Sequence, residues 1–588
     1  MNCAPERAGC AVFHKLLVAN RGEIAVRVLR TAKEMGLGTV AVYSEADRLA
    51  RHVTMADESY LLGPAAPAAS YLNVEKLLEI CKRSGADAVH PGYGFLAESA
   101  KFARAVVAAK LTWVGPHAAA IDAMGDKVRA RQTMVAAGVP VVPGGTQPIA
   151  DAAGAVAAAR EFGLPLALKA AGGGGGKGLK VARTADEIEG AFRTAQREAA
   201  AYFQDGTIYA ERYLENPKHV ELQVLADKHG HVVHVGERDC SLQRRHQKLW
   251  EETPAHIPSN VRDAMRAAGV QAAQTIGYDS AGTIECLVSG DRFYFLEMNT
   301  RIQVEHTVSE MVSGLDLIRE QIRIAAGEPL GYGQEAIRLD GHSIEGRVNA
   351  EDPLDNFRPA PGMLTAYQEP GGPGVRVDSA AYPGYSISAD YDSLLAKLVV
   401  WAPTRERALE RLRRAIGEFK IEGVPTTLAL LRALIDHPQV ADSSYGTATL
   451  ERFAATAFAG SGGSASQTAT TQPQTSEVLA VEVNDKLFRV RILDAPEGGP
   501  RLPAAPRRPK QRKMAAGAGN DISAPMHGVV VEVQCGPGQS VKSGQVVAII
   551  EAMKMMNEIR AHRDGVVAAV HAVAGGTIEA DSPLVTLE

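Results

Sequence analysis

The sequence predicts a multidomain protein in which a long region of mixed α and β structure (α/β, with α+β parts) precedes a smaller all-β domain. Three observations support this fold class. The chain has 588 residues, more than one hydrophobic core usually serves. Strand-like and helix-like apolar patterns alternate from the N-terminus onward. Residues 528–588 contain an internal repeat of short β patterns.

The first elements predict an open, parallel sheet. Residues 15–19 form a short apolar run, residues 20–22 (Asn-Arg-Gly) suit a turn, and a helical apolar periodicity then reaches Lys33. A second strand pattern at 38–43 completes a βαβ unit. The turn lacks the GxGxxG spacing, which argues against a dinucleotide site.

Composition narrows the classes of partner and compartment. Hydrophobic residues make up 46% of the chain and charged residues 22%, as in ordinary soluble domains. The net charge of -5 argues against nucleic acid or an anionic membrane as the main partner. Six scattered cysteines without a CxxC pair predict reduced thiols, and the sequence shows neither a signal peptide nor a long apolar stretch. We therefore expect a cytoplasmic protein.

A glycine run at 172–176 lies between two strand patterns, 164–169 and 179–183. Its backbone N–H groups carry no side-chain bulk and could close over phosphates, so the segment predicts a hairpin lid. It is not a Walker A loop, because Gly178 stands where Ser or Thr would hold Mg²⁺. Taken alone, the run is equally consistent with a plain flexible loop.

A second predicted hairpin, 283–288 and 292–299, carries two glutamates. Because side chains alternate along strands, a two-residue loop would place Glu285 and Glu297 on opposite faces and a three-residue loop on the same face. We predict the three-residue loop, 289–291, and with it a Mg²⁺ site formed by both carboxylates and Asn299. The alternative is a pair of exposed strand glutamates.

A candidate anion site follows directly in the sequence. If residues 301–306 are extended, Arg301, Gln303 and Glu305 share one face and offer a cation, an amide and a carboxylate to one small ligand. Upstream, Lys248 ends a basic run and supplies a point charge suited to phosphate or bicarbonate. Such a run is often a solvated face, but this one adjoins a predicted phosphate site, so we favour a functional role.

Composition changes after about residue 447. Residues 461–475 are small and polar, as in a flexible linker. Residues 478–493 alternate like two strands around a turn at 484–485, and this hairpin either docks a partner or packs on a neighbour. Residues 500–513 are rich in Pro, Arg and Lys without interleaved aromatics, which favours a solvated linker over a nucleic-acid patch.

The C-terminal repeat places one lysine at a special position. Residues 528–551 align without a gap on 565–588, which predicts two similar β halves in a pseudo-twofold sandwich or flattened barrel. Lys554 lies in the connection between the halves, flanked by methionines. A modification site explains this placement better than an ordinary solvated charge.

Residues 551–555 (Glu-Ala-Met-Lys-Met) resemble the attachment motif of biotinyl domains in biotin-dependent carboxylases; lipoyl domains lack the flanking Ala-Met and Met. Across about 13–450 the chain resembles the biotin carboxylase branch of the ATP-grasp enzymes. The segments that carry this resemblance are 19–24, 90–95, 124–127, 238–241, 297–305 and 346–352.

The resemblance implies five parts. The expected boundaries are 13–123 for the N-terminal α/β domain, 124–335 for the ATP-grasp domain with a lid at about 140–210, 336–455 for the carboxylase C-terminal domain, 456–520 for a linker with a small hairpin at about 477–493, and 521–588 for the biotinyl carrier domain.

It also implies roles for individual residues. The expected ATP-binding residues are Lys127, Lys169, Gly175, Gly176, Glu211, Arg212, Leu214, His219, Gln243 and His246, with Arg212 standing where lysine is common in the family. The expected bicarbonate-binding residues are Lys248, Arg301, Gln303 and Val304. The expected catalytic residues are Glu305, Arg347, Arg301 and Lys248, with Glu285, Glu297 and Asn299 holding Mg²⁺ or Mn²⁺ and Lys554 carrying biotin.

By resemblance, Glu305 removes the proton of bicarbonate, and ATP converts bicarbonate into carboxyphosphate, which breaks down to CO₂ and phosphate. The phosphate then takes the ureido proton of biotin while Arg347 stabilises the enolate. The sequence leaves no room for a carboxyltransferase, so we expect a separate β subunit, together with a biotin protein ligase and dimerisation through the carboxylase region.

The chain resembles α subunits of bacterial acyl-CoA carboxylases that act on acetyl- or propionyl-CoA in lipid metabolism. The alternatives are the α subunit of a methylcrotonyl-CoA or pyruvate carboxylase, a different ATP-grasp ligase, and a carrier without catalysis.

Overall fold

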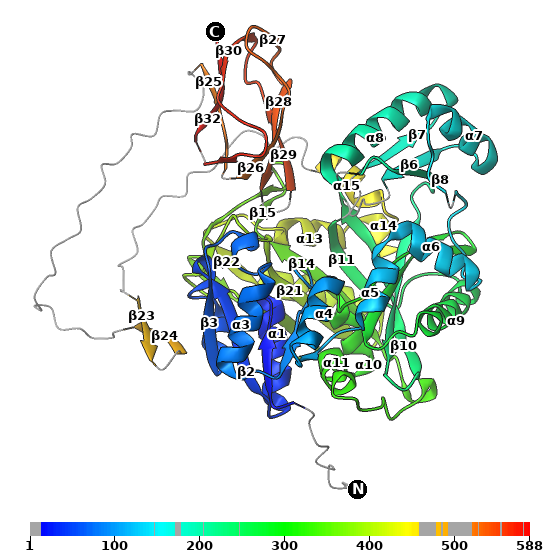
Figure 1. Cartoon of the computed structure of the whole chain (residues 1–588), viewed down its shortest axis with the longest axis vertical. Helices are drawn as coiled ribbons and strands as arrows, with labels where there is room; N and C mark the ends of the chain where they lie inside the picture. The colour runs from blue at the N-terminus through cyan, green and yellow to red at the C-terminus, as the bar shows by residue number, and fades with distance from the viewer. Residues whose placement is uncertain are drawn as a thin grey trace, which may run out of the picture.

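The computed structural model describes residues 13–145, 147–170, 178–203, 205–245, 247–457, 478–483, 486–491, 520–526, 528–552, 555–579 and 581–588 (Figure 1). Predictions on Gly175, Gly176, His246, Lys554 and the linkers at 461–475 and 500–513 therefore lie outside the described residues. Among the described residues, no helix combines the length and apolar character that crossing a bilayer would need.

The N-terminal unit confirms the predicted parallel sheet. Its five strands run in the order β3-β2-β1-β4-β5, with every neighbouring pair parallel. The order reverses between β1 and β4, and ligands of such sheets bind beyond the carboxyl ends of the strands at this point. The strands are β1 (Lys15–Val18), β2 (Gly38–Ser44), β3 (Glu58–Gly63), β4 (Ala88–His90) and β5 (Thr112–Trp113); the helices are α1 (Gly22–Glu34), α2 (Arg51–Met55), α3 (Val74–Ser84) and α4 (Ala100–Ala108).

The lid is a small three-stranded sheet in the order β7-β6-β8, covered by two helices (Figure 1). Its first two strands form the antiparallel hairpin that the glycine run predicted, with Lys169 paired to Leu179 next to the glycine segment. The elements are β6 (Leu166–Ala170), β7 (Leu179–Ala182), β8 (Ile208–Arg212), α7 (Ala152–Phe162) and α8 (Ile188–Phe203); α5 (Ala118–Gly125) and α6 (Lys127–Ala136) precede them.

An eight-stranded antiparallel sheet forms the centre of the molecule, in the order β13-β12-β9-β10-β11-β14-β21-β19. It consists of β9 (Lys218–Ala226), β10 (Val232–Arg244), β11 (Gln247–Thr253), β12 (Ala281–Ser289), β13 (Arg292–Asn299), β14 (His342–Asn349), β19 (Val375–Ser379) and β21 (Leu394–Ala402). Because strands from 218–299 and 342–402 hydrogen-bond in one sheet, groups far apart in sequence lie on one continuous surface.

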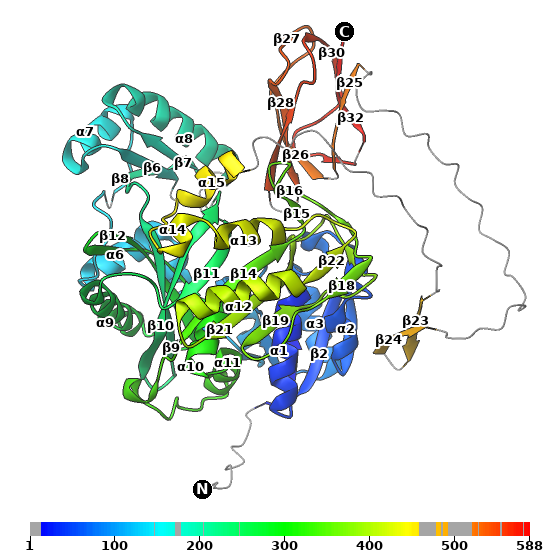
Figure 2. The ribbon, with the colours of Figure 1, turned by 180° about the vertical axis from the view of Figure 1, so that it is seen from behind.

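Helices cover both ends of this sheet. Figure 2 shows α12 and α13 across the part formed by β14 and β21. The helices are α9 (Ser259–Thr275), α10 (His306–Ser313), α11 (Leu317–Ala325), α12 (Arg405–Glu418), α13 (Leu428–Ile435), α14 (Pro438–Ala441) and α15 (Thr449–Ala457). Short strand pairs are β15 (Glu351–Asp352) with β16 (Arg358–Pro359), β17 (Gly362–Met363) with β20 (Ser386–Ile387), and β18 (Ala366–Gln368) with β22 (Lys420–Glu422).

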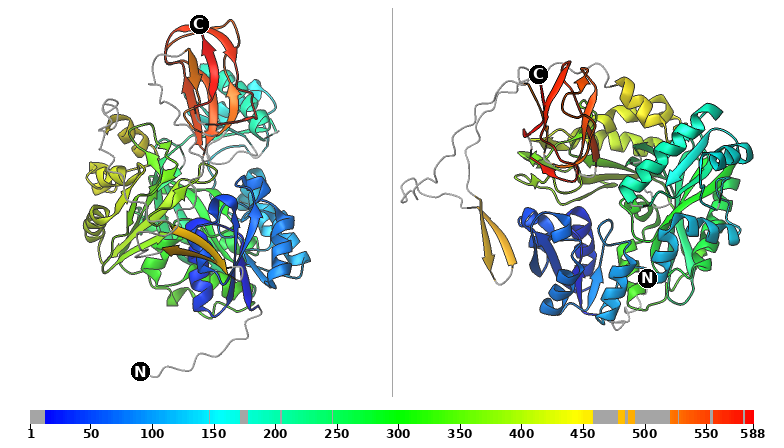
Figure 3. Two further views of the ribbon diagram at one scale, coloured as in Figure 1. Left: turned by 90° about the vertical axis from the view of Figure 1, so that its left-hand side faces the viewer. Right: turned by 45° about the horizontal axis from the view of Figure 1, so that its top comes forward.

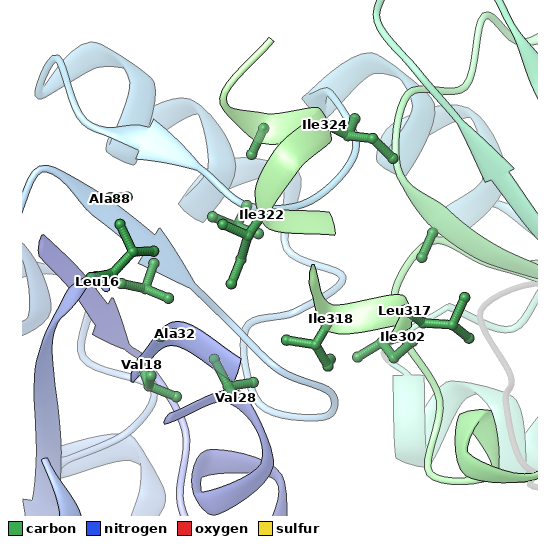
Figure 4. Packing of buried hydrophobic residues seen from close by; sticks show 14 of the residues in the cluster. Leu16, Val18, Val28, Ala32, Ala88, Ile302, Leu317, Ile318, Ile322 and Ile324 are labelled. Atoms are coloured by element: carbon green, nitrogen blue, oxygen red, sulfur yellow. The ribbon is translucent and has the colours of Figure 1, made fainter. Parts of the chain in front are cut away.

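One apolar cluster joins the N-terminal unit to the central sheet (Figure 4). Leu16 and Val28 from the first strand and helix belong to the same cluster as Ile302, Ile318 and Ile322, and all five are at most 2% exposed. Burial of each such side chain contributes about 1.5–3 kcal/mol. The cluster anchors the segment that carries the predicted anion site.

The predicted hairpin near 478–493 is present as β23 (Val478–Val483) and β24 (Lys486–Arg491), which pair antiparallel. The backbone of β24 lies beside α2 and the sheet-edge strand β3. The predicted turn residues 484–485 lie outside the described residues.

The β domain, residues 520–588, confirms the predicted pseudo-twofold fold and stands as a separate unit in Figure 3. Two four-stranded sheets run in the orders β29-β28-β26-β31 and β25-β32-β30-β27. The repeat maps β26 onto β30 and β28 onto β32, and each half contributes one short strand to the other half's sheet. The strands are β25 (Asp521–Ser523), β26 (Gly528–Val533), β27 (Ser540–Val541), β28 (Val546–Ala552), β29 (Met555–Arg560), β30 (Gly565–Val570), β31 (Thr577–Ile578) and β32 (Pro583–Leu587).

Candidate active site

A cavity of about 960 Å³ lies between the N-terminal unit, the lid, the central sheet and the β domain. Every predicted site residue that the structure describes lines it. These residues are Lys127, Lys169, Glu211, Arg212, Leu214, His219, Gln243, Lys248, Glu285, Glu297, Asn299, Arg301, Gln303, Val304, Glu305 and Arg347. The loops after β1 and β4 also reach the cavity, through Arg21 and Tyr93 among others, as the strand-order reversal in the sheet leads one to expect.

The predicted three-residue loop between β12 and β13 is wrong. Ser289 pairs with Arg292, so the loop has two residues. A β-bulge corrects the register: Cys286 pairs with Phe295 but Glu285 pairs with Glu297, so Leu296 is the extra residue. The two carboxylates therefore face each other across the strands as predicted, for a different reason.

The oxygen atoms gathered at this hairpin suit a hard divalent cation. Asn299 pairs with Thr283 two residues along the same ladder and donates through Nδ2 to Glu285 Oε1 at 2.9 Å. Glu297 forms an ion pair with Lys127 at 2.9 Å. Carboxylate and amide oxygens are the ligands that Mg²⁺ prefers.

The anion-site segment is not extended. Residues 301–305 form an irregular turn, and Glu305 is the N-cap of α10 with φ -78° and ψ 7°. Its three predicted side chains nevertheless reach one region of the cavity. Gln303 Nε2 donates to Glu285 Oε1 at 3.0 Å, and Arg301 Nε donates to Glu98 Oε2 at 2.9 Å.

Lys248 contacts three carboxylates in this region. Its Nζ donates to Glu221, Glu285 and Glu305 at 2.5, 2.9 and 2.7 Å, and its side chain is 11% exposed. Burial opposes its charge, but the three carboxylates raise the pKa of Lys248 well above its usual value. Lys248 is therefore a fixed cation.

Glu305 is held between two cations. It accepts from Lys248 at 2.7 Å and from Arg347 at 3.0 Å. Burial opposes its ionisation, yet Lys248, Arg347 and Arg238 hold the pKa of Glu305 well below its usual range. The neighbouring cations therefore favour the ionised carboxylate of Glu305.

Sequence reasoning missed the residue under this cluster. Arg238 is fully buried and donates to Glu221 at 2.7 Å, Gln223 at 2.7 Å and Gln303 at 2.8 Å. Arg238 thereby fixes the orientation of a predicted anion ligand. The available signal was the alternation of polar residues His219, Glu221 and Gln223 with apolar ones along β9.

On the lid side of the cavity, Lys169 and Arg131 both contact Glu211, the latter at 3.4 Å. Glu211 and Arg212 are the last two residues of the lid strand β8, and Leu214 lies just beyond it. Cations from α6 and the lid thus converge on the same space as the hairpin carboxylates, an arrangement suited to a nucleotide polyphosphate with its metal ion.

The β domain contributes one end of its first sheet to the cavity. Thr577, Val529 and Glu551 are cross-strand neighbours on β31, β26 and β28, and with Gly528 they line the cavity mouth. The backbones of Ala552 and Met555 pair at the end of the hairpin that flanks residue 554. The end of β28 that carries Glu551 therefore lies at the cavity.

Four family models match the chain. They are "Biotin carboxylase, N-terminal domain" at residues 12–121, "Carbamoyl-phosphate synthase L chain, ATP binding domain" at 126–332, "Biotin carboxylase C-terminal domain" at 345–452 and "Biotin-requiring enzyme" at 520–587.

The chain is also similar to curated proteins with names that match these family models. The chain is 44% identical to a biotin-dependent acyl-coenzyme A carboxylase alpha3 subunit of Mycobacterium leprae, over 96% of this chain and 97% of that protein. It is 51% identical to biotin carboxylase 1 of Bacillus subtilis, over 75% of this chain and 99% of the relative.

Among solved structures, a biotin carboxylase of Campylobacter jejuni in complex with an ATP analogue matches with a TM-score of 0.73 and 46% identity, over 75% of this chain and 99% of that one. The biotin carboxylase domain of the Hydrogenobacter thermophilus 2-oxoglutarate carboxylase, a dimer with MgADP and bicarbonate, matches with a TM-score of 0.72 and 48% identity, over 75% and 98% of the two chains.

The fold and cavity define an ATP-dependent ligase that carboxylates its acceptor. The chain belongs to the biotin carboxylase family and carries a biotin carrier domain, the β domain described above, on the same polypeptide. Its cofactors are biotin, ATP and Mg²⁺.

Proposed function

We propose that the chain is the α subunit of an acyl-CoA carboxylase that acts on acetyl- or propionyl-CoA. The observation that carries this proposal is the match to the M. leprae acyl-CoA carboxylase subunit, which extends through the carrier domain over 97% of that relative. Relatives named for pyruvate and 2-oxoglutarate align with 72% and 75% of this chain. The likeness over the whole chain favours an acyl-CoA acceptor.

In the proposed reaction Glu305 removes the proton of bicarbonate. Its ionised carboxylate and the two cations beside it support this role, because a base must lie within hydrogen-bond reach of an anion that those cations can hold. Lys248, Arg301, Gln303 and the backbone of Val304 would bind the bicarbonate oxygens.

ATP would lie between the lid and the hairpin of β12 and β13. Its phosphates would contact Lys127 and Lys169, with Gly175 and Gly176 of the lid, and its base would lie near Glu211, Arg212 and Leu214, with His219, Gln243 and His246 nearby. Glu285, Glu297 and Asn299 would hold Mg²⁺, which neutralises phosphate charge during transfer.

Arg347 would stabilise negative charge on the ureido oxygen of biotin, which Lys554 carries. A fixed guanidinium in a site shielded from water performs this role well, because it needs no reorganisation during the reaction. Its contacts with Glu305 and Glu251 fix it at the cavity wall.

The proposal requires partners. A separate β subunit would carry the carboxyltransferase, a biotin protein ligase would modify Lys554, and the carboxylase region would pair two chains. We place the protein in the cytoplasm.

The test is to purify the biotinylated chain with its co-purifying partner and to assay ATP- and bicarbonate-dependent carboxylation. The acceptors are acetyl-, propionyl- and methylcrotonyl-CoA, pyruvate and 2-oxoglutarate. Product from acetyl- or propionyl-CoA is the expected result. Product from a keto acid or methylcrotonyl-CoA alone would overturn the choice of acceptor and leave the carboxylase assignment intact.

A further inference from the structure

Behind Arg347 lie two glutamates to which the proposed mechanism gives no role. Glu251 on β11 and Glu345 on β14 are directly opposite each other in an antiparallel pair, so their side chains leave the same face of the sheet. Both residues are fully buried, and neither lines the cavity. Their Cβ atoms are expected about 4.5–5.5 Å apart.

In each glutamate, one carboxylate oxygen accepts a hydrogen bond and the other has no hydrogen-bond partner among the described residues. Glu251 Oε1 accepts from Arg347 Nε at 2.6 Å, and Glu345 Oε2 accepts from the Thr307 hydroxyl. Glu251 Oε2 and Glu345 Oε1 are buried and have no hydrogen-bond partner among the described residues. One proton on Glu345 Oε1, donated to Glu251 Oε2, would satisfy both.

The surroundings determine which glutamate carries that proton. Arg347 contacts Glu251 directly and favours its ionised form, whereas the direct partner of Glu345 is a neutral hydroxyl. Burial and then Glu251 raise the pKa of Glu345 well above its usual value; burial also raises the pKa of Glu251, but there the contact with Arg347 opposes it. The charged and titratable groups around the pair are Arg347, Lys397, Lys248, Glu305 and Cys240.

We propose that Glu251 and Glu345 share one proton, which resides on Glu345, and that this neutral acid keeps Glu251 ionised as the positioning residue for Arg347. In the proposed reaction this proton sharing would keep Arg347 in position. When Glu305 takes the proton of bicarbonate, it loses the charge that helps to hold Arg347. Glu251 keeps its charge and holds the guanidinium in place during carboxyl transfer.

The proton itself can be measured without any assay of activity. We expect the infrared spectrum of the wild-type chain without substrate to show a carbonyl-stretch band of a protonated buried carboxylic acid that the E345Q variant lacks. The E251Q variant is the matched control, because it replaces the other member of the pair. An E345Q spectrum with the band unchanged would overturn the proposal.

Kinetics test the positioning role, which rests on the proposed function. Glutamine is neutral and can donate to Glu251, so E345Q should keep kcat for bicarbonate-dependent ATP cleavage within about threefold at pH 7, while E251Q should lose at least about tenfold with KM for ATP unchanged. Loss of the shared proton at high pH should lower wild-type activity. The E345Q variant has no such proton to lose, so its rate of ATP cleavage should stay high to a higher pH than that of the wild type. An equal loss of kcat in both variants, or failure of E345Q to fold, would overturn the proposal.

The two assays separate the possible failures. Wild-type protein without bicarbonate-dependent ATP cleavage would contradict the proposed function, whereas the infrared band would still decide whether the proton is shared.

Discussion

The carboxylase cavity and the carrier domain differ in how much charge they bury. Charged groups lie in direct contact in the protein interior beside the cavity, such as buried Arg238 with Glu221 and half-buried Arg347 with buried Glu251. In the described part of the carrier domain, the buried residues are all apolar, with Val530, Ile550 and Leu587 at most 1% exposed. A site that binds and activates small anions requires fixed charge, whereas a domain whose proposed task is to present Lys554 requires only a stable core.

This contrast predicts the largest effect for the lysine itself. Lys554→Arg keeps the charge but removes the primary amine that biotin needs, so acyl-CoA carboxylation should fall to background. ATP cleavage stimulated by free biotin should stay near the wild-type rate, because the cavity is unchanged. Streptavidin blotting and radiolabelled bicarbonate incorporation measure both properties. Carboxylation that survives in this variant would mean that biotin is attached elsewhere.

A change in the cavity should show the reverse pattern. Glu305→Gln leaves Lys248 and Arg347 in place but removes the proton acceptor, so bicarbonate-dependent ATP cleavage should fall by about 10²–10⁴-fold, the usual contribution of a general base. Binding of ATP, measured by calorimetry, and biotinylation of the chain should persist. Near-normal turnover would contradict the role assigned to Glu305.

The sequence predicted the carrier domain more completely than the cavity, and the reason is local order. The repeat of 528–551 in 565–588 determines both halves, because equivalent residues such as Ile550 and Leu587 occupy equivalent core positions. Each half needs only nearby strands to define it.

The cavity depends on contacts that sequence spacing cannot reveal. The pairing of Glu285 with Glu297 was predicted from a loop length that the structure contradicts, because a bulge at Leu296 changes the register. The segment from Arg301 to Glu305 is a turn anchored by Ile302 in a distant core, not a strand. Residue types and the resemblance identified the site, but tertiary packing determines its geometry.

The two regions should also respond differently to acid. Burial works against the ionised forms of Glu305 and Glu285, yet neighbouring cations depress the pKa values of both carboxyls. Groups with depressed pKa values stabilise the folded state above their unfolded pKa of about 4.3, and this contribution is lost as the pH falls.

Calorimetry of the full chain from pH 5 down to pH 2 should therefore show the carboxylase transition move to lower temperature while the carrier transition moves little. Ile550→Ala identifies the carrier transition, because a cavity in that core costs about 2–5 kcal/mol and should affect that domain alone. Parallel shifts of both transitions with pH would contradict the contrast in buried charge.

The smallest expected effect concerns how the carrier meets the cavity, and the pseudo-twofold repeat provides its control. Val529 lies at the cavity mouth with 41% of its surface exposed, and its repeat equivalent Val566 is 39% exposed but does not line the cavity. Val529→Glu should slow carboxylation of the attached biotin by about fivefold to tenfold, equivalent to roughly 1–1.4 kcal/mol, because a charge is placed beside Glu551 at the mouth. Val566→Glu should leave the rate unchanged, although both variants alter equivalent positions of the same fold.

Single-turnover formation of carboxylated carrier measures the difference between the two variants. Equal rates would mean that this end of the sheet does not contact the carboxylase during the reaction.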